Sequence, residues 1–179
     1  MTVFNQNRTY GVEMEVVTGR RKETAARAIT EEFANSGIDA RCQVGEDNGR
    51  TYGHQTSANW KIVPDATIRP RGFEVVSPIL KGFDGREQIK AVCRALQALD
   101  CTVNTSVGMH VHHDARGLTA KQFGTIFGTY AAFQTLLNYG VAQSRRGRQY
   151  GGYNGIADWN VVSNRGTDMF DDGYNNSRA

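Results

Sequence analysis

The sequence lacks the features that mark secreted, zinc-ribbon and membrane proteins. Its three cysteines are an odd number and include no Cys-x-x-Cys pair. This count disfavours a disulfide framework or a zinc ribbon and fits a reducing compartment. The N-terminus has no apolar signal region, and no stretch approaches the roughly 18 apolar residues that a membrane span requires. We therefore expect a cytoplasmic protein that does not span a membrane.

The excess of positive over negative charge is also small. The net charge of +3 is too weak to indicate a specific nucleic-acid partner, although it suits an anionic substrate such as a nucleotide. The 179 residues are enough for one domain with a core, and 39% apolar residues are ordinary for a globular protein. No internal repeat, Walker loop, G-x-S-x-G elbow or G-x-G-x-x-G fingerprint occurs.

The apolar patterns predict an α+β fold. Strands are expected at residues 10–17, 39–44, 59–64, 73–76 and 107–113, and helices at 22–35, 85–99 and 120–139. Asp84 is expected to cap the second helix, and Thr119 with Gln122 to form a capping box on the third. Several strand pairs are too close for helical crossovers, which indicates an antiparallel sheet with helices packed on one face. We expect a single domain over residues 1–140 and a frayed Arg/Gly/Asn-rich segment over 141–179.

Two carboxylates share one face of the first predicted strand. Glu13 and Glu15 are two residues apart, so both side chains would point the same way. Such a pair repels itself unless a cation, a proton or an arginine compensates, and Mg²⁺ prefers carboxylate oxygens. The alternative is that both carboxylates simply face solvent, while residues that include Val12 and Met14 point from the other face of the strand into the core.

Two histidines share a face of the last predicted strand. His110 and His112 flank Val111, and His-x-His on a strand is a familiar metal-binding geometry, including for zinc. Contact with a metal or a phosphate and an ordinary surface position both stay open.

A third carboxylate, Glu74, lies inside a Phe/Val run, where an unpaired buried charge would be costly. Its partner is either a structural lysine or arginine, or a metal shared with Glu15.

After the last predicted helix come Arg145, Arg146 and Arg148. Their guanidinium groups suit phosphate and carboxylate oxygens, although a solvated surface is the ordinary explanation of a short basic run.

Four blocks, in the same order, resemble the amidoligase family. Residues 11–15 (GVEME) resemble its first-strand GVExE motif, and residues 60–80 resemble its second block, with a tryptophan strand, a D-x-[ST] turn and an E-[LV]-V-S-P strand. Residues 107–112 (VGMHVH) are similar to its GxHVH block and to the GMHVH string of glutamine synthetase. Residues 144–146 (SRR) resemble the SRR after its long helix. These carboxylate–amine ligases have a glutamine-synthetase-like catalytic core and are often encoded by phages and in bacterial gene clusters.

The resemblance implies a site for ATP and two Mg²⁺ or Mn²⁺ ions. Glu13 and His110 would hold one metal ion. Glu15 and Glu74 would hold the other. These assignments depend on the family motifs and not on the spacing of the residues.

Further roles follow from the same resemblance. His112 would face the nucleotide phosphates. Arg145 and Arg146 would contact phosphate or the activated carboxylate. Asp65 matches a recurrent family position and is, with these arginines, a candidate catalytic residue.

The implied activity is ATP-dependent amide formation through an acyl phosphate, on an amino acid, peptide or protein that supplies a carboxylate and an amine. The family's later T-[VI]-E-[FW]-R block has no match, because residues 164–168 are not that motif. A truncated or split chain, or a module that binds nucleotide and metal without turnover, therefore stays an alternative. A zinc hydrolase using His110 and His112 is a further one, and a homo-oligomer is left open.

Overall fold

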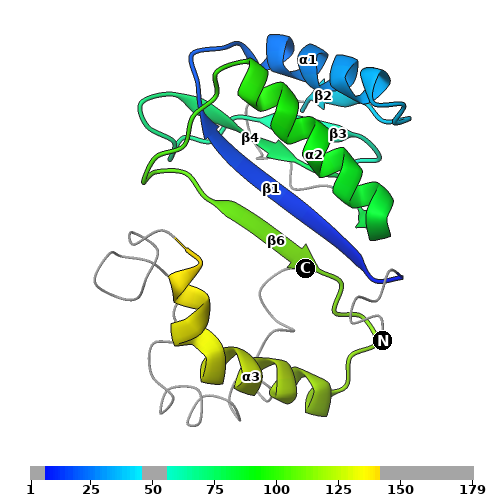
Figure 1. Cartoon of the computed structure of the whole chain (residues 1–179), viewed down its shortest axis with the longest axis vertical. Coiled ribbons are helices and arrows are strands. Elements are labelled where there is room, and N and C mark those ends of the chain that lie inside the picture. The colour runs from blue at the N-terminus through cyan, green and yellow to red at the C-terminus, as the bar shows by residue number, and fades with distance from the viewer. Residues whose placement is uncertain (1–6, 46–55, 142–179) are drawn as a thin grey trace, which may run out of the picture. The chain divides into compact units, whose positions relative to one another are not determined.

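The computed structural model describes residues 7–45 and 56–141 (Figure 1). The chain divides into two compact units, Met1–Ala115 and Arg116–Ala179. In chain order the elements are β1 (Thr9–Val17), α1 (Lys22–Asn35), β2 (Cys42–Val44), β3 (Trp60–Val63), β4 (Gly72–Val76), β5 (Leu80–Lys81), α2 (Gly82–Ala98), β6 (Met109–His113) and α3 (Ala120–Tyr139). The first unit contains the six strands with α1 and α2, and the second contains α3.

The sheet of the first unit is built around β1. On one edge β1 pairs antiparallel with β4, through residues 13–17, and with β5, through Thr9 and Tyr10. The opposite edge pairs antiparallel with β6. Beyond β4 lie β3, which is antiparallel to β4, and β2, which is parallel to β3. The predicted α+β class with a mostly antiparallel sheet is therefore confirmed, while the likeness to glutamine synthetase stays a prediction.

One face of the sheet packs against α1 and α2 (Figure 1). Alternate residues of β1 are buried there, Val12, Met14 and Val16, because successive side chains of a strand point to opposite faces. The rings of Phe33 on α1 and Trp60 on β3 are both fully buried, with their centroids 6.1 Å apart. This packing leaves the odd-numbered residues of β1 on the other face, which we call the open face.

Two helix boundaries test the predicted caps of the first unit. α1 ends as predicted, with Ser36 at its C-cap and Gly37 in the left-handed region at φ 68°. The predicted cap by Asp84 is wrong, because α2 begins earlier, at Gly82, with Lys81 at the N-cap position and no side-chain cap. β5 leads directly into the helix, so Asp84 lies in the first turn, where a carboxylate still favours the helix dipole.

The second unit is described through α3. Its predicted capping box is confirmed: Thr119 Oγ1 accepts a hydrogen bond from the Gln122 backbone N–H, and Gln122 Oε1 accepts one from the Thr119 N–H. The predicted single domain over residues 1–140, which would join α3 to the sheet, stays a prediction. The predicted segment 141–179 lies outside the described residues apart from Val141. Within the described ranges, no helix is long and apolar enough to cross a membrane.

Candidate metal centre

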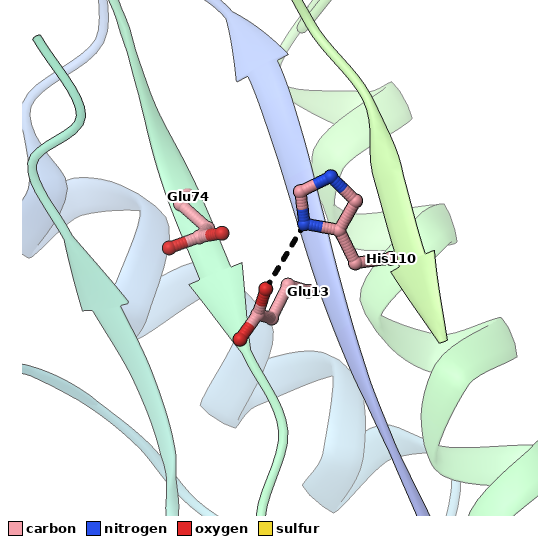
Figure 2. Close-up of side chains that lie close together, drawn as sticks. All are labelled: Glu13, Glu74 and His110. Atoms are coloured by element: carbon pink, nitrogen blue, oxygen red, sulfur yellow. Dashed lines mark hydrogen bonds and ion pairs between the residues drawn. The ribbon is translucent and has the colours of Figure 1, made fainter. Parts of the chain in front are cut away.

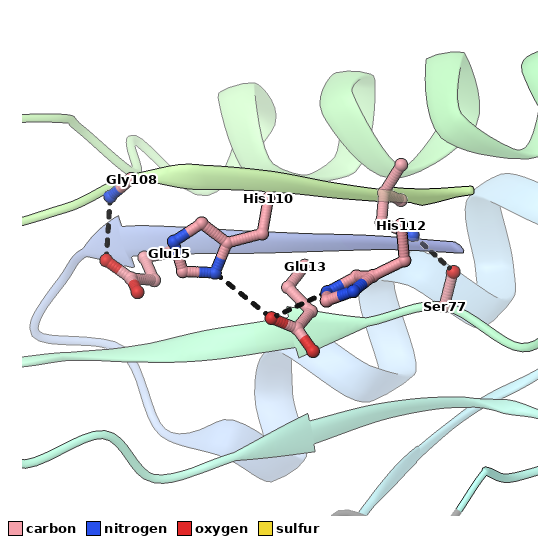
Figure 3. A network of polar contacts seen from close by, with 7 residues as sticks. Glu13, Glu15, Ser77, Gly108, His110 and His112 are labelled. Atoms are coloured by element: carbon pink, nitrogen blue, oxygen red, sulfur yellow. Dashed lines mark hydrogen bonds and ion pairs between the residues drawn. The ribbon is translucent and has the colours of Figure 1, made fainter. Parts of the chain in front are cut away.

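The strand registers bring five predicted site residues to the open face. Glu13 of β1 lies opposite His110 of β6, and Gly11 lies opposite His112. On the other edge of β1, Glu15 lies opposite Glu74 of β4. Residues directly opposite one another in a sheet share a face. Figure 3 shows the side chains of Glu13, Glu15, His110 and His112 on the same side of the sheet.

Three of these side chains converge. Glu13, Glu74 and His110 each offer one ligand atom, and the three atoms all lie within 4.8 Å of one another (Figure 2). Glu13 Oε2 is 3.1 Å from His110 Nδ1. Glu74 is only 4% exposed, whereas the His110 side chain is 57% exposed, so the group has a buried side and a solvent side. We call these three residues the donor group.

A second imidazole lies against the same carboxylate. His112 Nε2 is 3.3 Å from Glu13 Oε2, so Glu13 lies between two histidines (Figure 3). Partial burial raises the pKa of Glu13, but hydrogen bonds from His110 and His112 and their charge outweigh it, and the pKa is lowered overall. Glu13 is therefore an ionised carboxylate at neutral pH, which is the form that binds a cation.

Glu15 has a different environment. Its Oε2 accepts a hydrogen bond of 2.7 Å from the Gly108 N–H, and its own N–H donates to the Gly108 carbonyl. Glu15 is not a member of the donor group, in which Glu74 lies with Glu13 and His110. That Glu15 and Glu74 hold a second metal ion stays a prediction, although the register does place them directly opposite each other.

Ser77 is a residue of this region that the sequence interpretation missed. Its Oγ accepts a 2.8 Å hydrogen bond from the Val12 N–H, and its own N–H donates to the Val12 carbonyl. Three residues lie between Val76 and Leu80, but only two lie between their β1 partners Glu13 and Tyr10, so the strand bulges here. The hydroxyl of Ser77 replaces the missing backbone acceptor. The Ser-Pro pair that closes the predicted strand was the available signal.

The remaining candidates lie elsewhere or outside the described residues. Asp65 Oδ1 accepts hydrogen bonds of 2.7 Å from both the N–H and the hydroxyl of Thr67, so its carboxylate holds a turn. Asp65 is not a member of the donor group. Arg145 and Arg146 lie outside the described residues. The catalytic roles predicted for these three residues stay predictions.

The fold and the site together define an α+β protein with a candidate cation site on the open face of a mostly antiparallel sheet. The chain belongs to the family whose model is described as "Putative amidoligase enzyme", which matches residues 6–153. That description implies an enzyme of the ligase type. No curated protein and no solved structure matches the chain.

Proposed function

We propose that the protein is an ATP- and Mg²⁺-dependent ligase that joins a carboxylate to an amine. Family membership supports the reaction class. The observation on which the proposal depends most is the convergence of Glu13, Glu74 and His110 within 4.8 Å on one sheet face. A phosphoryl-transfer enzyme needs such a cluster, because its main task is to position and neutralise charged groups.

The donor group fits a hard divalent cation. Two of its three ligand atoms are carboxylate oxygens, which Mg²⁺ and Mn²⁺ prefer. When bound, the ion would neutralise phosphate oxygens and orient the nucleotide.

The proposed reaction has two steps. A carboxylate oxygen of the substrate forms a bond to the γ-phosphorus of ATP, and ADP leaves. The amine nitrogen then attacks the acyl carbon, and phosphate leaves with that carboxylate oxygen while the amine loses a proton. In this scheme His112, beside Glu13, donates an N–H to a phosphate oxygen. Arg145 and Arg146 would bind the phosphate or the activated carboxylate.

The test uses ¹⁸O-labelled carboxylates. The chain is incubated with ATP, Mg²⁺ and a panel of labelled amino acids and peptides, and products are measured by mass spectrometry. We expect an amide whose mass is that of its two labelled precursors less one ¹⁸O-containing water, together with ADP and phosphate that contains one ¹⁸O. The matched variants are Glu13→Gln, which should abolish product, and Glu31→Gln on the exposed side of α1, which should not.

Three other outcomes are informative. No ADP with any substrate, together with unchanged nucleotide binding in Glu13→Ala, would refute the ligase proposal. Mg²⁺-dependent ATP binding without ADP formation would indicate a nucleotide-binding module. Stoichiometric zinc after purification would favour a zinc hydrolase instead.

A further inference from the structure

A lysine lies in the same cross-strand row as two members of the donor group. The register pairs Lys61 of β3 with Val76 of β4, Val76 with Glu13 of β1, and Glu13 with His110 of β6. The row therefore crosses four strands in the order Lys61, Val76, Glu13 and His110. Lys61 lies on the β4 side of Glu13, and His110 lies on the opposite side.

Lys61 faces the open side of the sheet. Its neighbours Trp60 and Ile62 are fully buried in the core beneath the helices, and side chains alternate along a strand. Lys61 itself is only 8% exposed, which is uncommon for a lysine. A buried ammonium group needs anionic partners, and the open face holds the carboxylates of Glu13, Glu15 and Glu74.

The donor group is within the reach of this side chain. Glu74 lies opposite Val63, so Lys61 is its diagonal neighbour across β3 and β4. Diagonal neighbours are about 7–8 Å apart at the backbone, a separation that long side chains bridge. The residue between Lys61 and Glu13 is Val76, whose short apolar side chain offers no competing polar group. The ammonium group can therefore reach the donor group across Val76.

The charges of the open face indicate what Lys61 binds. Glu13, Glu15 and Glu74 supply three negative charges, and Lys61 one positive charge. One divalent cation at the donor group would balance the remaining two. The cation and the ammonium group then repel each other, so an anionic oxygen that contacts both lowers the energy of the site. A nucleotide phosphate supplies such an oxygen, and lysine is a common phosphate-binding residue because its charge is compact.

We propose that Lys61 is a nucleotide-binding residue of this site, whose ammonium group contacts a phosphate oxygen of the nucleotide held at the donor group. The inference rests on the proposed function, since it requires that a nucleotide binds there. It adds a residue from β3 to a site otherwise formed by β1, β4 and β6.

The experiment compares Lys61→Met with Lys90→Met by calorimetry. Lys90 is exposed on α2 and pairs with Glu87 at 2.6 Å, so its replacement controls for the loss of one positive charge. The ligands are ATP with Mg²⁺, adenosine, and Mn²⁺ alone. We expect Lys61→Met to bind ATP at least about tenfold more weakly, because a charge-assisted hydrogen bond is lost. Adenosine binding should not change, Mn²⁺ binding should be equal or tighter, and Lys90→Met should match the wild type.

Other results would overturn the inference. Wild-type ATP affinity in Lys61→Met would exclude a phosphate contact, and an equal loss of Mn²⁺ affinity would show that Lys61 only organises the donor group. If circular dichroism shows that Lys61→Met does not fold, the comparison is repeated with Lys61→Gln and Lys61→Arg. We then expect weak ATP binding for Lys61→Gln and near wild-type binding for Lys61→Arg. If the wild type binds no ATP with Mg²⁺, the proposed function itself fails, and this outcome is distinct from a failure of Lys61 alone.

Discussion

Glu13 and His110 are 97 residues apart in the chain, yet Glu13 Oε2 lies 3.1 Å from His110 Nδ1 across two neighbouring strands. The contact exists because β6 returns to pair with the edge of β1 opposite β4. Since Glu74 approaches from β4, three strands each contribute one ligand atom to the same point. A sheet holds such atoms more rigidly than loops would, which favours a preformed cation site.

Glu15→Gln should weaken Mn²⁺ binding less than Glu13→Gln. Glu15 Oε2 already accepts a hydrogen bond from Gly108, and Glu15 is not one of the three converging residues. Electron paramagnetic resonance titration of free Mn²⁺ would measure both affinities. Equal losses in the two variants would instead support the predicted second metal ion between Glu15 and Glu74.

Ser77→Ala should lower the free energy of unfolding by about 1–3 kcal/mol, because it leaves the buried Val12 N–H without its acceptor. Ser77→Thr keeps the hydroxyl and should cost less. Denaturant unfolding followed by circular dichroism provides the measurement. Ser36→Ala, at the exposed C-cap of α1, is the control and should stay within about 0.5 kcal/mol of the wild type. A neutral Ser77→Ala would show that the bulge does not need this hydroxyl.

Strand alternation was sufficient to predict which side chains share a face. The spacing of Glu13 with Glu15 and of His110 with His112 placed the two members of each pair on one face of their own strand, and the register of β1 with β6 brings the two pairs to the same side of the sheet. The spacing alone could not predict which carboxylate would converge with His110, because that depends on the register between strands far apart in the chain. The pairing of Glu13 with His110 came from the family resemblance. The same resemblance paired Glu74 with Glu15, and the register places these two residues directly opposite each other. A ligand atom of Glu74 also lies within 4.8 Å of those of Glu13 and His110.

Local connections were also hard to predict. β5 is two residues long, and so short a strand has no recognisable alternation. Because β5 leads directly into α2, the helix begins before Asp84, the best capping residue in that region. The cap of α3 was predicted correctly because Thr119 and Gln122 interact only with each other's local backbone and side chain. Local motifs were therefore predicted better than features that depend on tertiary pairing.

Phe33→Ala should destabilise the first unit by about 3–5 kcal/mol. Phe33 is fully buried against Trp60, and its removal leaves a cavity in a core that cannot fully collapse. Phe83→Ala is the matched control. Because Phe83 is 51% exposed on α2, this substitution should lower the free energy of unfolding by less than about 1 kcal/mol. Thermal and denaturant unfolding measure both variants. Similar losses would contradict the assignment of Phe33 to the core.

Cys42 should resist thiol reagents at pH 8, whereas the exposed Cys93 should react. Burial raises the pKa of Cys42 from its ordinary value of 9.0 to about 12, so the native thiol stays protonated. The protonated Cys42 thiol therefore contributes to the free energy of unfolding below pH 9.0, and this contribution is lost as the pH rises towards 12. Mass spectrometry after brief alkylation gives the labelling of each cysteine. Rapid labelling of native Cys42 would contradict the packing of β2 against α1.

The most direct test of the central claim is a calorimetric titration with Mn²⁺ of the wild type, Glu13→Gln, Glu74→Gln and His110→Gln, with Glu31→Gln as the control. If the donor group holds a divalent cation, the wild type and the control bind Mn²⁺ alike, and each of the other three variants binds at least about tenfold more weakly, because each removes one ligand. Wild-type Mn²⁺ affinity in all three donor-group variants would contradict the account.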